Sequence, residues 1–130
     1  MIDALIVEDE ADIRNLLGEQ LQDKGCAVRK ASNGAAGLRS VNRRKPDIMF
    51  VVIMMPVMDG IDLISELHKN PETVDIPVVL VTGVSAPAET MKVVGLGVRY
   101  RLSKPWKQEE LDFVFEQSLK NMTGTVTART

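Results

Sequence analysis

The chain has few of the residues that usually form cross-links or metal clusters. Its 130 residues include one cysteine and one histidine, Cys26 and His68. A single cysteine excludes an internal disulfide and is typical of a reducing compartment. His68 lies near the expected end of a helix, where the helix dipole favours a cation. We therefore expect a surface role for His68 rather than metal or phosphohistidine chemistry.

A strong charge of one sign and long apolar runs are absent as well. The formal net charge is −2, which gives no electrostatic case for nucleic acid or an anionic membrane as a partner. No apolar run reaches the roughly 18–20 residues that span a bilayer, and the N-terminus has no signal-peptide pattern. The sequence therefore predicts a cytoplasmic protein.

What the chain does have is a set of short, continuous apolar segments. The longest runs from Ile48 to Met55, between Pro46 and Pro56, and shows no alternation with polar residues. Such a run predicts a strand buried on both faces, as in a parallel sheet covered by helices. Asp59-Gly60 then indicates a turn that opens the next helix, with Asp59 as its cap.

Four further strand candidates and five helix candidates alternate with this pattern. The strands are expected at 2–7, 26–31, 48–55, 76–82 and 98–102. The helices are expected at 12–24, 33–45, 61–70, 85–95 and 111–119. This alternation predicts an α/β fold with βαβ units and one parallel sheet. Five-stranded doubly wound sheets commonly have the strand order 2-1-3-4-5, which places the first and third strands at the centre.

The chain is expected to form one domain over residues 1–121. Residues 122–130 are small and polar, which predicts a flexible tail or the start of a linker. Glu8 and Asp9 follow the first strand, and Val52 lies near the end of the third. Ligands bind at the carboxyl ends of the strands in sheets of this kind, so these positions mark the candidate site.

The segment from Pro46 to Gly60 closely resembles the third strand and following loop of response-regulator receiver domains of two-component signalling. The resemblance covers about residues 2–120 and implies a flavodoxin-like fold. It also implies magnesium held by Glu8, Asp9 and the backbone carbonyl of Met54. Adjacent side chains diverge on a strand, but just beyond its end both acids can turn inward. The alternative is an acidic run at a helix start, where negative charge is favoured.

The resemblance also implies roles for Thr82 and Lys104. In the family, a hydroxyl residue and a lysine at these positions contact the phosphoryl group. The phosphoacceptor aspartate of the family corresponds here to Val52, which has no oxygen to accept a phosphoryl group or bind a metal. Magnesium binding is therefore expected to be weak at best. Lys104 is expected to pair with Glu8 or Asp9 instead.

A second departure affects the family's switch. Its aromatic residue three positions before the lysine is replaced by Arg101, with Tyr100 one place earlier. Burying a guanidinium is costly unless it is paired, so the usual aromatic rotation is in doubt. Trp106 and Phe113 lie off the apolar stripe of the last helix and are candidates for a partner surface.

The sequence thus predicts a non-enzymatic receiver domain that acts as a protein-interaction module and lacks the usual phosphorylation. Its partner would be a histidine kinase, a phosphotransfer protein or an effector domain. One alternative is a conventional receiver in which the aspartate at position 52 was replaced by engineering. Another is a flavodoxin-like enzyme that binds a nucleotide or flavin, but no G-x-G-x-x-G follows a strand.

Overall fold

In the computed structural model, five parallel strands form one sheet in the predicted order β2-β1-β3-β4-β5. The structure describes residues 1–83 and 94–127, and of 121–127 only the backbone. The strands are β1 (Asp3–Val7), β2 (Ala27–Ala31), β3 (Ile48–Val52), β4 (Val78–Thr82) and β5 (Tyr100–Ser103). The helices in the described part are α1 (Ala11–Asp23), α2 (Gly34–Arg43), α3 (Gly60–Lys69) and α5 (Gln108–Thr127).

Several element boundaries differ from the sequence expectation, and one expected helix falls outside the described residues. The helix expected at 85–95 lies almost wholly outside the described residues. Strand β3 ends at Val52 rather than Met55, because the Ile53 carbonyl already accepts a hydrogen bond from Gly60 N at 2.7 Å. Helix α5 continues to Thr127, beyond the position where we expected a tail to begin. The domain boundary at 121 stays a prediction.

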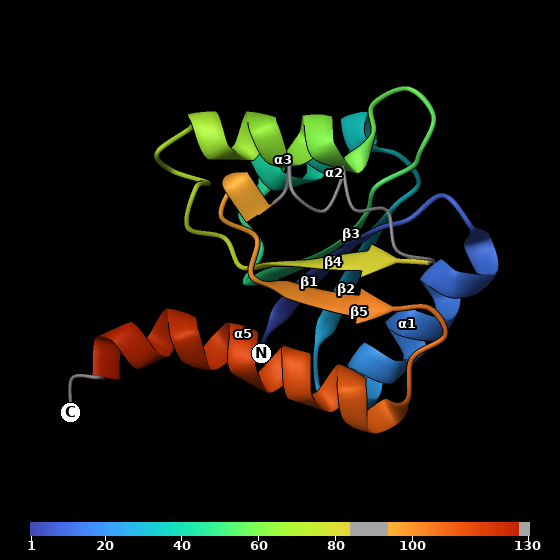
Figure 1. The fold of residues 1–130 in the computed structure, drawn as a ribbon, viewed down its shortest axis with the longest axis vertical. Coiled ribbons are helices and arrows are strands. Elements are labelled where there is room, and N and C mark those ends of the chain that lie inside the picture. Colours follow the sequence, from blue (N-terminus) through green and yellow to red (C-terminus); the bar gives the residue numbers. More distant parts are fainter. Residues whose placement is uncertain (84–93, 128–130) are drawn as a thin grey trace.

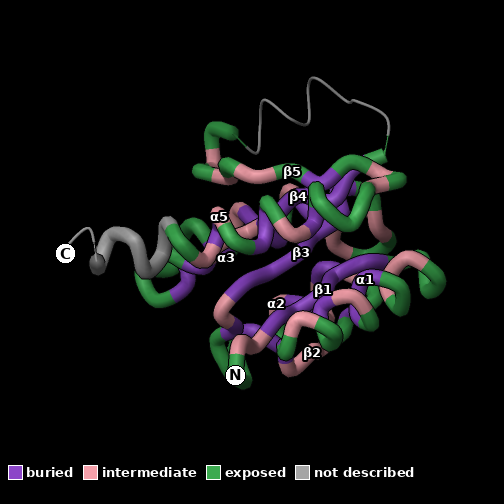
Figure 2. The backbone as a smooth tube through the Cα atoms, turned by 90° about the horizontal axis from the view of Figure 1, so that it is seen from below, coloured by how far each residue is buried: buried purple, intermediate pink, exposed green. Residues whose placement is uncertain are grey.

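The helices cover the sheet on both faces (Figure 1). Helices α2 and α3 lie on one face, and α1 and α5 on the other, so the central strands have no exposed side. All five residues of β3 are buried, in line with the unbroken apolar run in the sequence. Figure 2 shows the same contrast along the chain, with buried central strands and exposed outer turns.

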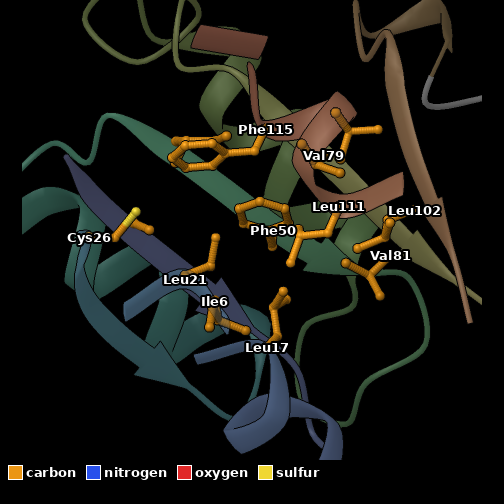
Figure 3. Close-up of a cluster of buried hydrophobic side chains, with 13 residues drawn as sticks. Ile6, Leu17, Leu21, Cys26, Phe50, Val79, Val81, Leu102, Leu111 and Phe115 are labelled. Carbon is orange, nitrogen blue, oxygen red and sulfur yellow. The ribbon is translucent and has the colours of Figure 1, made fainter. Parts of the chain in front are cut away.

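Alternation along each strand divides the core into two layers. Phe50 of β3 faces α1 and α5, where it packs among Leu21, Leu111 and Phe115 (Figure 3). Its neighbours Met49 and Val51 face α2 and α3 instead. The core therefore holds the central strands from both sides and fixes the edge at which they end.

Two helices begin at side-chain caps, and the cap predicted at Asp59 is confirmed. The Asn33 side chain accepts a hydrogen bond from Ala36 N at 2.8 Å, at the start of α2. The Asp59 side chain accepts one from Asp62 N at 2.8 Å, at the start of α3. Each cap satisfies a backbone donor that the first helical turn leaves free. Within the described ranges, every helix is too short or too polar to pass through a bilayer.

Candidate functional site

The carboxyl ends of the strands bring together residues that lie far apart in the sequence. The register pairs Val52 of β3 with Val81 of β4, and Thr82 of β4 with Ser103 of β5. Lys104 follows directly, and its backbone N donates to the Thr82 carbonyl at 2.7 Å. Val52 and Thr82 are both 8% exposed, so the site lies at the rim of the core.

Glu8 is the buried anion of this site. Its backbone N donates to the Ala31 carbonyl at 3.0 Å, which extends the β1–β2 ladder one residue past Val7. Side chains still alternate there, so the Glu8 side chain turns inward and the residue is 2% exposed, whereas Asp9 is exposed. The two acids therefore diverge, and only Glu8 turns inward, although the sequence allowed both to do so.

Lys104 pairs with Glu8, as predicted. Its ammonium lies 2.9 Å from Glu8 Oε1 and 3.3 Å from Glu10 Oε1. The Glu8 contact is an ion pair without the directed geometry of a hydrogen bond, so Oε1 is buried with no hydrogen-bond donor. The other oxygen, Oε2, accepts a hydrogen bond from Glu10 N at 3.1 Å. An ammonium shared by two carboxylates thus occupies the centre of the site.

Burial raises the pKa of Glu8, while the Lys104 ammonium and the Glu10 N–H oppose that rise. Burial alone would lower the pKa of Lys104, but contact with Glu8 and Glu10 outweighs it, and the pKa of Lys104 is raised. Each partner therefore depends on the other for its charged form.

Arg14 is a site residue that the sequence analysis missed. Its Nη1 donates to the Glu8 carbonyl at 2.9 Å and approaches the Asp9 carbonyl at 3.4 Å. The sequence could have indicated Arg14, because it lies one helical turn after Glu10. The Glu10 carbonyl accepts a hydrogen bond from Arg14 N. A second cation therefore stands beside the acidic run.

The loop after β3 folds back over position 52. A Cβ on Gly60 would lie 2.1 Å from the Val52 carbonyl oxygen, so only glycine fits this close approach. Val57, at the tip of the loop, has φ 71°, which is unfavourable for a β-branched residue, and it is 83% exposed. The Met54 side chain is 77% exposed and points away from the core.

Comparison with known proteins matches this architecture to one family. Residues 4–116 match the family model of the response regulator receiver domain. This chain belongs to the receiver domain family. PilH of Pseudomonas aeruginosa is 38% identical over 109 residues, which cover 82% of this chain and 88% of PilH. The receiver domain of NtrX from Brucella abortus is 31% identical, with a TM-score of 0.83 over 91% of this chain and 98% of that domain.

Other relatives are longer than this receiver domain. A probable transcriptional regulator, ycf27 of Guillardia theta, is 33% identical over 108 residues, which are 83% of this chain but 41% of that protein. The transcriptional regulatory protein RprY of Bacteroides fragilis is matched over 50% of its length. This chain therefore spans about half of several curated relatives. Receiver domains are signalling modules that interact with histidine kinases and effector domains.

Receiver domains typically bind Mg²⁺ at the phosphorylation site. The donor set here fits that ion poorly. One Glu8 oxygen already contacts Lys104 and the other a backbone N–H, and Val52 offers no oxygen. Across residues 1–83 and 94–127, no cluster of three or more acidic, histidine or cysteine side chains is placed to hold a metal.

The second departure from the family pattern lies on β5. Arg101 is exposed there, and the Tyr100 hydroxyl donates to the Gln117 carbonyl at 3.4 Å. Phe113 is 62% exposed, as its position off the apolar stripe suggested. Trp106 is half-buried instead, and its Nε1 donates to Gln20 Oε1 at 2.9 Å. His68 lies in the last turn of α3, as predicted.

Proposed function

We propose that this receiver domain acts as a protein-interaction module of a two-component or phosphorelay pathway without being phosphorylated by the usual route. The observation that carries the proposal is Val52 at the end of β3, in the position of the family's acceptor aspartate. Glu8, Thr82 and Lys104 lie at the same edge of the sheet as Val52, which supports the interpretation that the auxiliary groups remain without the nucleophile. Its partner would be a histidine kinase, a phosphotransfer protein or an effector domain.

Two physical arguments support the proposal. Valine has no lone pair to attack a phosphohistidine, so no acyl phosphate can form at position 52. Phosphoryl transfer also needs a cation to neutralise the charge that develops in the transition state. Here the Lys104 ammonium already neutralises the charge of the Glu8 carboxylate, which favours one charge state of the site at rest. Such a domain would signal by binding its partner, without a cycle between a phosphorylated and an unphosphorylated state.

Acetyl phosphate with Mg²⁺ tests the proposal directly. We expect the intact mass of the protein to stay unchanged, while a receiver domain that has the acceptor aspartate, treated in parallel, serves as a check on the reagents. A stable mass increase of one phosphoryl group, located on an aspartate at any other position, would contradict the proposal. Asp9, and Asp59 and Asp62 at the start of α3, are the positions to inspect first, although Asp59 already caps the helix.

A further inference from the structure

The outer edge of β2 presents backbone groups that pair with no strand in the described part of the chain. Strand β2 is one of the two edge strands of the sheet, and among the described strands it pairs only with β1. Ala27 N donates to Ile2 O and Ala31 O accepts from Glu8 N, so the odd-numbered residues of β2 face β1. In a parallel strand the next residues face the opposite way. The N–H and C=O groups of Val28 and Lys30 therefore point outward.

This edge is less covered than the rest of the sheet. Lys30 is exposed and Val28 half-buried, whereas every residue of β3 is buried. Figure 2 shows β2 at the margin of the fold in the colours of exposed and half-buried residues. An open edge of this kind can accept an additional strand.

Cations without carboxylate partners flank the edge on both sides. On the α2 side a groove of about 480 Å³ runs between β2 and α2, and Arg39 and Arg43 line it one helical turn apart. Both are exposed, and neither forms an ion pair with a described residue. On the α1 side the Lys30 ammonium contacts the Asn15 amide oxygen at 3.2 Å rather than a carboxylate.

The neighbouring cations of the same region behave differently. Arg29 and Arg44 both pair with Asp3, and Lys45 pairs with Asp75. Lys30, Arg39 and Arg43 differ from these three cations because they have no carboxylate partner among the described residues. Like charges one helical turn apart repel each other, so an anion bound between Arg39 and Arg43 would stabilise α2.

We propose that the outer edge of β2 is a docking site for an extended acidic segment of a partner protein. The segment pairs with the backbone groups of Val28 and Lys30, and alternate acidic side chains reach Arg39 and Arg43 in the groove. The same cations repel a basic strand, so charge selects the partner. This surface is remote in sequence from Val52 and Lys104, and its use does not depend on phosphorylation.

The test uses a fluorescein-labelled eight-residue peptide of alternating glutamate and valine, with binding followed by fluorescence anisotropy and by amide NMR shifts. We expect saturable binding, with the largest shifts and slowed exchange at the Val28 and Lys30 amides. A lysine–valine peptide should not bind. A glutamate–valine peptide N-methylated on the face that pairs with β2 should lose most of its affinity, because it cannot complete the ladder.

Charge-reversal variants give the matched comparison. The double variant Arg39→Glu/Arg43→Glu should bind the acidic peptide at least about tenfold more weakly. Arg101→Glu/Lys107→Glu changes the net charge equally on exposed positions outside the groove and should bind as the parent does. Equal weakening in both double variants, unchanged binding of the N-methylated peptide, or no binding by the parent would each overturn the proposal.

Discussion

The two ends of β1 each hold a carboxylate paired with a cation, but their surroundings differ. At the amino end, Arg29 donates two hydrogen bonds to Asp3, two to Ser40 and one to the Arg44 carbonyl. Arg44 adds a further contact to Asp3 at 2.9 Å. The guanidinium fork and both Asp3 oxygens are therefore satisfied.

At the carboxyl end, the Glu8–Lys104 pair is less complete. Glu8 is more deeply buried than Asp3, yet its Oε1 has an ion-pair contact and no hydrogen bond. The adjoining loop holds Val57 in a left-handed conformation. Backbone strain tends to collect at functional sites, whereas a saturated hydrogen-bond network is typical of a structural role. The amino end thus holds the fold together, and the carboxyl end is the place where we propose that the phosphoacceptor is missing.

The largest expected effect belongs to the amino end. Arg29→Ala removes all five hydrogen bonds and leaves the half-buried Asp3 with the exposed Arg44 alone. We expect the free energy of unfolding to fall by about 3 kcal/mol, measured by urea denaturation. Arg43→Ala is the control, since Arg43 is exposed and lies on α2 of the same region; it should change stability by less than about 0.5 kcal/mol. Similar losses of stability in the two variants would mean that the hydrogen bonds of Arg29 contribute no more to stability than an exposed arginine nearby.

Lys104→Met should cost about 2 kcal/mol at pH 7, because it leaves a buried glutamate without its cation. Burial already raises the pKa of Glu8, and the loss of Lys104 raises it further. A raised pKa means that the folded protein binds the proton more tightly than the unfolded chain, so the defect shrinks as the pH falls through the folded pKa.

Thermal unfolding between pH 7 and pH 4 checks this dependence. The double variant Glu8→Gln/Lys104→Met should recover most of the stability at pH 7, because no buried charge remains. In the parent, the pKa of Lys104 is raised, so the contribution of its ammonium persists through neutral pH and is lost only as the pH rises through that pKa. A defect in Lys104→Met that does not vary with pH would mean that Glu8 is not the group responsible.

Val52→Asp should convert the carboxyl end into a magnesium-dependent site. Without metal, the added carboxylate beside Glu8 should lower stability by about 1–2 kcal/mol. With Mg²⁺ the midpoint of thermal unfolding should rise, because the ion binds only the folded state. The parent, which has no carboxylate at position 52, should show no such rise. Transmission of a signal should stay poor, since Arg101 still occupies the aromatic position. Absence of any metal-dependent rise would mean that Glu8 and Asp9 do not form a metal site even when a carboxylate is restored at position 52.

The smallest effect concerns the loop beside Val52. Val57→Gly should raise stability by about 0.5–1 kcal/mol, because glycine adopts φ 71° without strain and an exposed valine loses little packing. Val74→Gly is the matched control, since Val74 is also exposed but has no positive φ. It should lose stability through the greater freedom of the unfolded chain. A loss in both variants would show that the loop is not strained.

Much of the fold follows from local features of the sequence. The apolar runs of β3 and β4 require helices on both faces, and the alternation of strands and helices then requires a parallel sheet. Asn33 and Asp59 cap helices because their side chains reach backbone donors only a few residues away. The need of Lys104 for a carboxylate could also be read from the residue types at the strand ends.

Other features were decided by contacts between distant segments. Sequence alone left Glu8 and Asp9 equivalent as partners of Lys104; the β1–β2 ladder continues through Glu8, and alternation turns that side chain alone inward. The end of β3 at Val52 depends on the hydrogen bond between Ile53 and Gly60 across the loop. Arg29 finds Asp3, Ser40 and Arg44 only when β2 and α2 are packed together. Local propensity acts over a few residues, whereas the direction of a side chain and the partner it meets are fixed only when the whole sheet is assembled.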